Sequence, residues 1–240
     1  MVFRPFSELK VRIFADGGEK AAIEQLCALP YIRGFTTNPT LMRKAGVTDY
    51  RAFARDVLSS VGDRPISFEV FADDFPCMEA QAREIASWGP NVCVKIPVTN
   101  TLGEPALDLM RRLAHSGVSV NATALMTLDQ VRDVASALSG GAPSCVSVFA
   151  GRIADTGRDP VPVMSDALEI TRSHNNMELI WASPREVLNI FQADDIGCDI
   201  ITVTSDLLKK LGTVGKDLDE FSLETVRMFY NDAQQSGFRL

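Results

Sequence analysis

The stretch VSVNATALMTLDQVRDVASAL, residues 118–138, holds the pattern that decides the fold. Its first residues alternate between apolar and polar side chains, and this two-residue period predicts a strand that begins at Val118. Thr127 and Gln130 then fit a capping box, and the apolar residues behind it recur at helical spacing: Leu128, Val131, Val134, Ala135 and Leu138. The stretch therefore predicts one strand followed by one helix.

The same strand-and-helix unit repeats along the chain. Short runs rich in β-branched residues begin near eight positions: Val11, Ile32, Ile66, Val92, Val118, Cys145, Glu178 and Asp199. Helical segments such as Tyr50–Val61 separate these runs, and no linker or low-complexity tract interrupts the series. Eight units in about 200 residues predict an α/β fold of the (β/α)8 TIM-barrel type. An open doubly wound sheet is the alternative, but the regular count favours closure.

Length and composition indicate one ordinary globular domain. We expect a single barrel domain over residues 1–240, with an additional C-terminal helix over about 218–236. Hydrophobic residues make up 46% and charged residues 23%, which excludes a disordered chain. The formal net charge of -7 disfavours general binding to nucleic acid, which needs a cationic surface.

Neither a membrane protein nor a metalloenzyme is indicated. No apolar run reaches the roughly 20 residues that span a bilayer, and Met1–Phe14 has no signal-peptide core. Five widely spaced cysteines without a CxxC pair predict free thiols, so we expect a cytoplasmic protein. His115 and His174 are the only histidines, which leaves no zinc-ligand spacing and few candidates for a histidine triad. We therefore expect no metal and no cofactor.

Polar side chains occupy the inward face of the predicted barrel. Because unpartnered buried polar groups cost stability, such a lining indicates a site rather than packing alone. The active site of a barrel lies at the carboxyl ends of its strands, and ten candidates lie there: Asp16, Asn38, Glu69, Lys95, Asn121, Thr123, Ser147, Arg152, Ser183 and Arg185.

Lys95, in the apolar strand Val92–Pro97, is the sharpest signal. Across proteins such a lysine is more often ion-paired, or extends its charged end to solvent. In the fourth of eight strands the way to solvent is closed, so burial favours the neutral amine, which attacks carbonyl groups and forms an imine. Asp16 and Glu69 supply the proton transfers that this chemistry needs, although an aspartate before two glycines also suits a turn.

Arg152 and Arg185 predict a phosphorylated substrate. Ser183, Pro184 and Glu186 fit an N-cap, a first-turn proline and a capping-box partner. A helix N-terminus binds anions, and arginine binds phosphate through its planar fork. Each arginine alone is compatible with an ordinary surface role. A glycine-rich phosphate loop is not evident, so nucleotide chemistry ranks below these hypotheses.

Five segments resemble the transaldolase family, in the same order along the chain: Gly34–Thr40, Val94–Pro97, Asn121–Thr123, Ser147–Arg152 and Ala182–Arg185. Together they are specific, and the resemblance extends over about residues 11–211. It implies a class I aldolase barrel without a metal, acting on sugar phosphates in carbohydrate metabolism such as the pentose phosphate pathway. It also implies a homo-oligomer, a pentamer or a decamer.

The resemblance implies a role for each matching residue. Lys95 would form the imine, and Asp16 would take the proton from the hydroxyl whose carbon–carbon bond breaks. Glu69 would shuttle protons together with Thr123 and a water. The remaining residues would bind substrate: Asn38, Asn121 and Ser147 at the dihydroxyacetone unit, Arg152, Ser183 and Arg185 at the phosphate, and Thr36 and Phe149 beside them.

Two further activities stay open beside transfer of dihydroxyacetone. Fructose-6-phosphate aldolases resemble this chain in length, but typically carry glutamine in place of Glu69 and tyrosine in place of Phe149. Both differences favour transfer over release of free dihydroxyacetone. A sugar-phosphate-binding barrel without catalysis is the third hypothesis.

Two residues depart from the family pattern. Phe35 stands where the family usually has a polar or acidic residue, and parity allows the bulky Trp181 to face the barrel. The identities of the donor and acceptor sugars therefore stay open.

Overall fold

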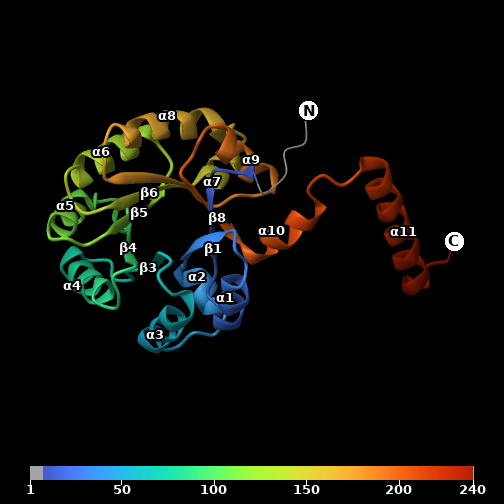
Figure 1. Ribbon diagram of the computed structural model, residues 1–240, viewed down its shortest axis with the longest axis horizontal. Helices are drawn as coiled ribbons and strands as arrows, with labels where there is room; N and C mark the ends of the chain where they lie inside the picture. Colours follow the sequence, from blue (N-terminus) through green and yellow to red (C-terminus); the bar gives the residue numbers. More distant parts are fainter. Residues whose placement is uncertain (1–7, 240) are drawn as a thin grey trace.

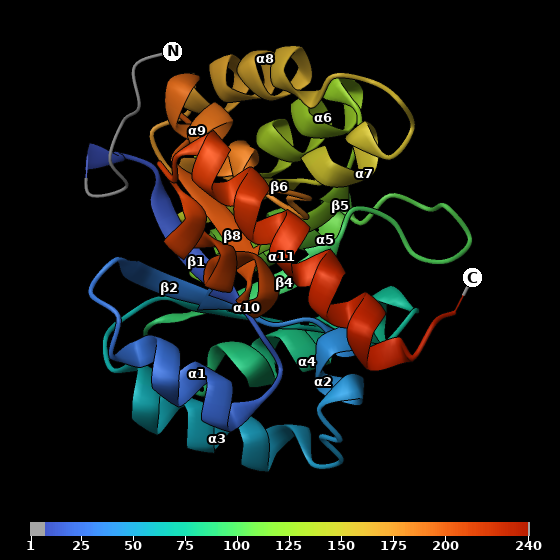
Figure 2. The ribbon, with the colours of Figure 1, turned by 90° about the vertical axis from the view of Figure 1, so that its right-hand side faces the viewer.

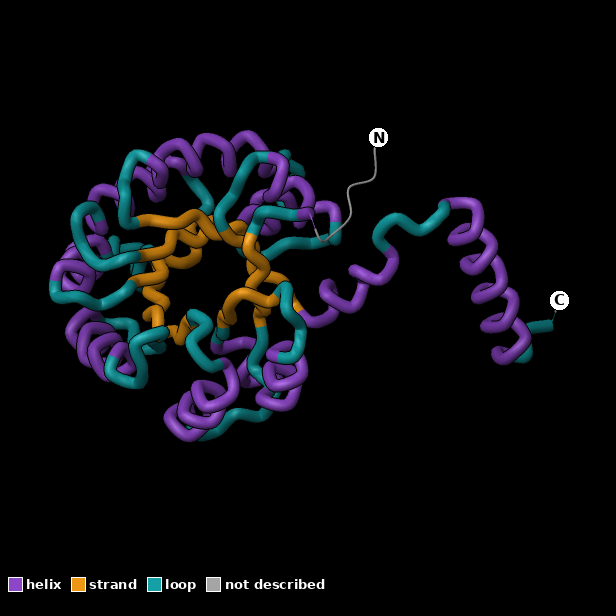
Figure 3. Tube along the Cα trace, in the orientation of Figure 1, coloured by secondary structure: helices purple, strands orange, loops and turns teal. Residues whose placement is uncertain are grey.

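Eight parallel strands close into a barrel in the computed structural model, which describes residues 8–239 (Figure 3). The strands pair in chain order, and β8 pairs with β1. Their bounds are β1 (Arg12–Asp16), β2 (Ile32–Thr36), β3 (Ile66–Glu69), β4 (Val92–Pro97), β5 (Val120–Leu125), β6 (Ser144–Val148), β7 (Met177–Trp181) and β8 (Ile200–Thr204). The predicted (β/α)8 barrel is confirmed.

Helices surround the strands on the outside of the barrel (Figure 1). The helices are α1 (Lys20–Cys27), α2 (Pro39–Lys44), α3 (Tyr50–Val61), α4 (Phe75–Ala86), α5 (Leu107–His115), α6 (Leu128–Leu138), α7 (Ala150–Ala154), α8 (Pro160–Arg172), α9 (Leu188–Asp195), α10 (Ser205–Lys209), the 3-10 helix η2 (Lys210–Thr213) and α11 (Leu218–Ser236), of which α11 lies apart from the barrel. The capping box of Thr127 and Gln130 is formed at the start of α6. Between residues 8 and 239, no helix combines the length and apolarity needed to cross a bilayer.

Alternation along the strands separates two apolar regions. The larger one lies between strands and helices, and a smaller cluster inside the barrel contains Phe14, Ile180, Ala182 and Ile200. Phe14 needs the absence of a side chain at Gly34, because a Cβ atom there would lie 2.5 Å from the phenyl ring. These residues form an apolar floor on one side of the barrel interior.

Trp181 does not face the barrel, contrary to one expectation from its parity. It pairs with Val148 on β6 and Ile201 on β8, and all three belong to the outer apolar region. Phe35 also points outward, where it is fully buried and lies under the guanidinium of Arg64, 5.2 Å from the ring centroid. Neither bulky ring therefore occupies the barrel interior.

Helix α11 stands away from the barrel, beyond α10 and η2 (Figures 1 and 2). Asp217 caps its first turn, and none of its residues is buried. Seven large apolar side chains on this helix are exposed: Leu218, Phe221, Leu223, Val226, Met228, Phe229 and Tyr230. Exposed apolar surface of this extent on one element is typical of an interaction surface.

Substitution Gly34→Ala should destabilise the barrel through overpacking against Phe14. We expect a loss of about 1–3 kcal/mol in the free energy of unfolding, measured by urea denaturation. Gly212→Ala is the matched control, since a Cβ atom there would meet nothing within 4 Å. Equal stability of the two variants would contradict the steric role of Gly34.

Candidate active site

A pocket of about 540 Å³ opens at the carboxyl ends of the strands. It brings together every predicted site residue except Asn121: Asp16, Thr36, Asn38, Glu69, Lys95, Thr123, Ser147, Phe149, Arg152, Ser183 and Arg185. Thr202 and Thr204 of β8 also line it. Within residues 8–239, no group of three or more His, Cys, Asp or Glu side chains is arranged to hold a metal ion.

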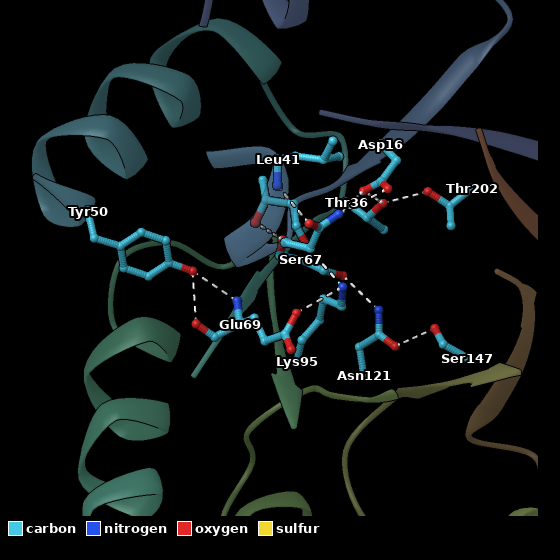
Figure 4. Close-up of polar contacts among 12 residues, drawn as sticks. Asp16, Thr36, Leu41, Tyr50, Ser67, Glu69, Lys95, Asn121, Ser147 and Thr202 are labelled. Atoms are coloured by element: carbon cyan, nitrogen blue, oxygen red, sulfur yellow. Dashed lines mark hydrogen bonds and ion pairs between the residues drawn. The ribbon is translucent and has the colours of Figure 1, made fainter. Parts of the chain in front are cut away.

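The amine of Lys95 lies inside the barrel between two acceptors (Figure 4). Its Nζ donates to the backbone carbonyl of Thr37 at 2.9 Å and lies 3.2 Å from Oε2 of Glu69. The register of β3 and β4 places Glu69 directly opposite Lys95. The ion-paired arrangement is therefore the one observed, and it also puts a carboxylate within reach of the ammonium protons.

Tyr50 holds the backbone of Glu69 in place. Its hydroxyl donates to the Glu69 carbonyl and accepts from the Glu69 amide, both at 2.9 Å (Figure 4). Burial raises the pKa of Tyr50, so the hydroxyl stays protonated as this double contact requires. The ring packs edge-on against Phe68 and Trp88. The sequence did not reveal this role, because Tyr50 fits the apolar pattern of the predicted helix Tyr50–Val61.

Asp16 is a carboxylate held between two strands. It accepts from Thr36 Oγ1 at 2.8 Å and from Asn38 Nδ2 at 3.2 Å. Burial raises the pKa of Asp16, while the charge of Lys95 and these hydrogen bonds oppose the rise. Asn38 also caps α2, because its Oδ1 accepts from the amide of Leu41 at 2.9 Å. A carboxylate with a raised pKa is suited to accept a proton.

Asn121 lies below the pocket rather than on its wall. It is fully buried, its Nδ2 donates to Ser67 Oγ at 3.0 Å, and its Oδ1 accepts from Ser147 Oγ at 2.7 Å. Of these three hydrogen-bonded side chains, only Ser147 lines the pocket. Ser67 had no place among the candidates, although its inward parity was a usable signal. These three hydrogen-bonded side chains form a polar layer below the pocket, on the side of the barrel interior opposite the apolar floor.

Thr123 carries a hydroxyl with no hydrogen-bond partner among the described residues, although its Oγ1 is buried. The next residue, Ala124, has a φ of 67°, and the register of β5 with β6 shifts at this point. Such a bulge turns the side chains at a strand end. An unpartnered buried hydroxyl on a pocket wall is suited to bind a substrate oxygen or a water.

The two arginines stand in different environments. Arg185 forms a two-pronged ion pair with Asp155, with Nε 2.9 Å from Oδ1 and a second contact from NH2 to Oδ2. This pair lowers the pKa of Asp155. Arg152 lies over the ring of Phe149, 5.9 Å from its centroid. Gly151 permits the close packing here, since a Cβ atom on it would lie 1.5 Å from the Ser183 carbonyl oxygen.

The predicted helix N-terminus at Ser183 is wrong. Ser183 has a φ of 61°, and helix α9 begins only at Leu188, with Val187 before it. Asn189 instead accepts from the amides of Arg185 at 2.7 Å and Glu186 at 3.1 Å. The segment after β7 is therefore a tight loop closed from the helix side, and any anion there would meet side chains rather than a helix terminus.

Known proteins of one family match this chain. The family model for Transaldolase/Fructose-6-phosphate aldolase matches residues 13–240. A probable transaldolase of Dehalococcoides mccartyi is 35% identical over 202 residues, covering 84% of this chain and 90% of that protein. One from Syntrophomonas wolfei is 34% identical with the same coverage. One from Exiguobacterium sp. is 31% identical over 226 residues, 93% of this chain and 99% of that protein.

A solved structure matches the fold. A crystal structure from Burkholderia cenocepacia J2315, described as a lyase/mutase, superposes with a TM-score of 0.58. The match covers 98% of this chain and 85% of the other, at 11% sequence identity. At this identity the likeness concerns the barrel and not the chemistry.

Substitution Asp16→Asn should change how stability depends on pH. Between the ordinary aspartate pKa of about 3.9 and the raised pKa of Asp16, the folded protein binds more protons than the unfolded chain, so the contribution of Asp16 to stability is lost as pH rises. The free energy of unfolding of the variant should therefore rise relative to that of the parent as the pH increases above about 4.

Urea unfolding at a series of pH values measures this difference. Asp63→Asn is the control, because it makes the same change at an exposed position. If the free energy of unfolding of Asp16→Asn relative to the parent stays constant or falls with rising pH, burial does not raise the pKa of Asp16.

Proposed function

From the premise that this chain belongs to the transaldolase/fructose-6-phosphate aldolase family, we propose that it is a transaldolase acting through an imine on Lys95. The observation that carries the proposal is the buried amine of Lys95 on the wall of the pocket, 3.2 Å from Glu69. The donor is a ketose phosphate and the acceptor an aldose or aldose phosphate. The unit transferred is dihydroxyacetone.

Imine formation begins with loss of a proton from Lys95. Glu69 Oε2, at 3.2 Å, is the nearest carboxylate acceptor. The neutral amine attacks the C2 carbonyl of the ketose and gives a carbinolamine. Protonation of its hydroxyl, through Glu69 and a water bound by Thr123, lets water leave and gives the iminium. The unpartnered hydroxyl of Thr123 supports this role.

Carbon–carbon cleavage follows from the position of Asp16. Its carboxylate takes the proton of the C4 hydroxyl, the C3–C4 bond breaks, and the electron pair moves into the iminium to give an enamine. The aldose phosphate leaves with the new carbonyl at C4. An acceptor aldehyde then receives the enamine carbon, Asp16 returns the proton to the new hydroxyl, and hydrolysis frees Lys95.

Substrate contacts divide between the two ends of the pocket. Thr36, Asn38 and Ser147 line the same pocket as the catalytic groups and bind the dihydroxyacetone unit. Asn121 acts from below by fixing the Ser147 hydroxyl. At the rim, Arg152, Ser183 and Arg185 bind the phosphate.

Two residues favour transfer over release of free dihydroxyacetone. Phe149 presents a ring without a hydroxyl to the pocket, so it gives no proton to the enamine. Glu69 is a carboxylate rather than the amide typical of the aldolase branch. The enamine therefore persists until an aldehyde arrives. The aldolase-type lyase is the second candidate, because its chemistry up to the enamine is the same.

Seven exposed apolar side chains on α11 support a homo-oligomer, for which the family resemblance implies a pentamer or a decamer. A second copy is the occupant that we propose for this helix. A groove of about 700 Å³ between α1, α2 and α10 has Leu26, Leu29 and Leu208 in its walls and charged side chains such as Lys44 and Asp206 beside them, so it could receive an amphipathic helix. Packing of α11 on another copy would remove both apolar surfaces from water.

Borohydride reduction of the protein with fructose 6-phosphate should leave a three-carbon adduct on Lys95. Peptide mapping by mass spectrometry identifies the site, and the size of the adduct reports C3–C4 cleavage. Lys95→Met should give no adduct and no turnover. Lys209→Met, which removes an exposed lysine, should behave like the parent.

The same protein distinguishes the candidate functions. Steady release of free dihydroxyacetone without an acceptor would show that the protein is an aldolase-type lyase and not a transaldolase. Sugar-phosphate binding that survives Lys95→Met, without turnover or adduct in the parent for any ketose tried, would favour a binding barrel.

Substitution Phe229→Asp on α11 should weaken self-association at micromolar concentration. Light scattering after size exclusion measures the mass of the assembly. Asn231→Asp adds the same charge to an exposed polar position on this helix and should leave the mass unchanged. A parent protein that elutes as a monomer would contradict the proposed oligomer.

A further inference from the structure

Thr202 on β8 lines the pocket but was not among the candidate residues. Its Oγ1 is 2.5 Å from the Oγ1 of Thr36 on β2, and both residues are buried. Thr36 in turn contacts Oδ1 of Asp16 at 2.8 Å (Figure 4). The three side chains come from β8, β2 and the strand β1 between them.

Counting hydrogens sets the direction of these contacts. A threonine hydroxyl has one proton to donate and lone pairs to accept. An ionised Asp16 only accepts, so the proton of Thr36 points to Asp16. The contact between the two threonines must then be donated by Thr202. The result is a one-way chain from Thr202 through Thr36 to the carboxylate.

We propose that Thr202 is a positioning residue for Asp16, which it orients and keeps ready to accept a proton by fixing the hydroxyl of Thr36. The inference rests on the role of Asp16 in the proposed function. Because Thr202 donates to Thr36, the proton of the Thr36 hydroxyl remains directed at Asp16. A hydroxyl that itself accepts a hydrogen bond is also a stronger donor. Asn38 holds the second oxygen of Asp16 at 3.2 Å, so the carboxylate is fixed from two sides.

The register of the barrel supports this role. Thr202 pairs with Phe14, two residues before Asp16, whereas Thr204 pairs with Asp16 itself. Thr202 therefore supports the site from the level below, at the boundary between the apolar floor and the polar pocket. The charge of Lys95 also acts on this carboxyl, and Glu69, Arg152 and Arg185 are the other charged side chains that line the same pocket.

Substitution Thr202→Val keeps the shape of the side chain and removes the donor. The rate of C3–C4 cleavage should fall about tenfold, the equivalent of about 1.4 kcal/mol in the barrier. The acid limb of its pH–rate profile should move to higher pH, because a carboxylate with a weaker donor holds its proton more readily. Thr202→Ser keeps the hydroxyl and should restore both the rate and the limb.

A matched control separates this effect from general loss of packing. Thr171→Val removes another buried threonine hydroxyl, bonded to helix carbonyls of α8, and should leave the pH profile unchanged. Circular dichroism checks the fold of each variant, and Thr202→Ala serves as the second donorless variant if the valine does not fold.

Imine formation provides the readout that isolates Thr202 from the rest of the mechanism. Dihydroxyacetone itself forms the imine without any need for Asp16, so borohydride trapping with it should be equal in the parent and Thr202→Val. No trapping in the parent would overturn the proposed function. Trapping together with an unchanged cleavage rate and acid limb in the donorless variants would overturn the role of Thr202 alone.

Discussion

A buried lysine amine imposes the main constraint on this barrel. The amine of Lys95 cannot be left without partners inside the protein, because an unpaired buried cation is strongly disfavoured. Two acceptors meet the requirement, the carbonyl of Thr37 and the carboxylate of Glu69. Glu69 in turn depends on Tyr50, which brings α3 into the support of the site. Helices outside the barrel thus take part in placing the reacting groups.

The interior of the barrel is divided to meet this requirement. On one side Phe14, Ile180 and Ile200 fill the space with apolar side chains. On the other, Asn121 joins Ser67 and Ser147 so that every polar atom of its amide has a partner. The apolar side is packed without buried polar groups that would need partners. On the polar side, hydrogen bonds connect the buried Asn121 to Ser147 on the pocket wall. Asp16 and Lys95 stand above this boundary, where a carboxylate and an amine can both be held.

Local patterns were enough to predict the strands, three of the helices (α3, α6 and α11) and most of the residues that line the pocket. Alternation along a strand and closure of the barrel together place inward side chains at one end, so Asp16, Glu69 and Lys95 follow without knowledge of contacts. The N-cap expected at Ser183 failed because a capping pattern does not report that the preceding backbone must pass against Gly151. Contacts such as that of Tyr50 with the Glu69 backbone join residues far apart in sequence, and no local pattern encodes them.

The pocket wall contains strained backbone and a buried hydroxyl without a hydrogen-bond partner. Among the described residues, Ala124 and Ser183 are the non-glycine residues with positive φ, and both line the pocket. Thr123 also leaves a buried hydroxyl unpartnered. Each feature costs stability, and neighbouring strands offer the regular geometry that would avoid it. The position of Ala124, Ser183 and Thr123 after or at the carboxyl ends of β5 and β7 is consistent with a wall shaped to meet a ligand, because a bound oxygen would satisfy the Thr123 hydroxyl.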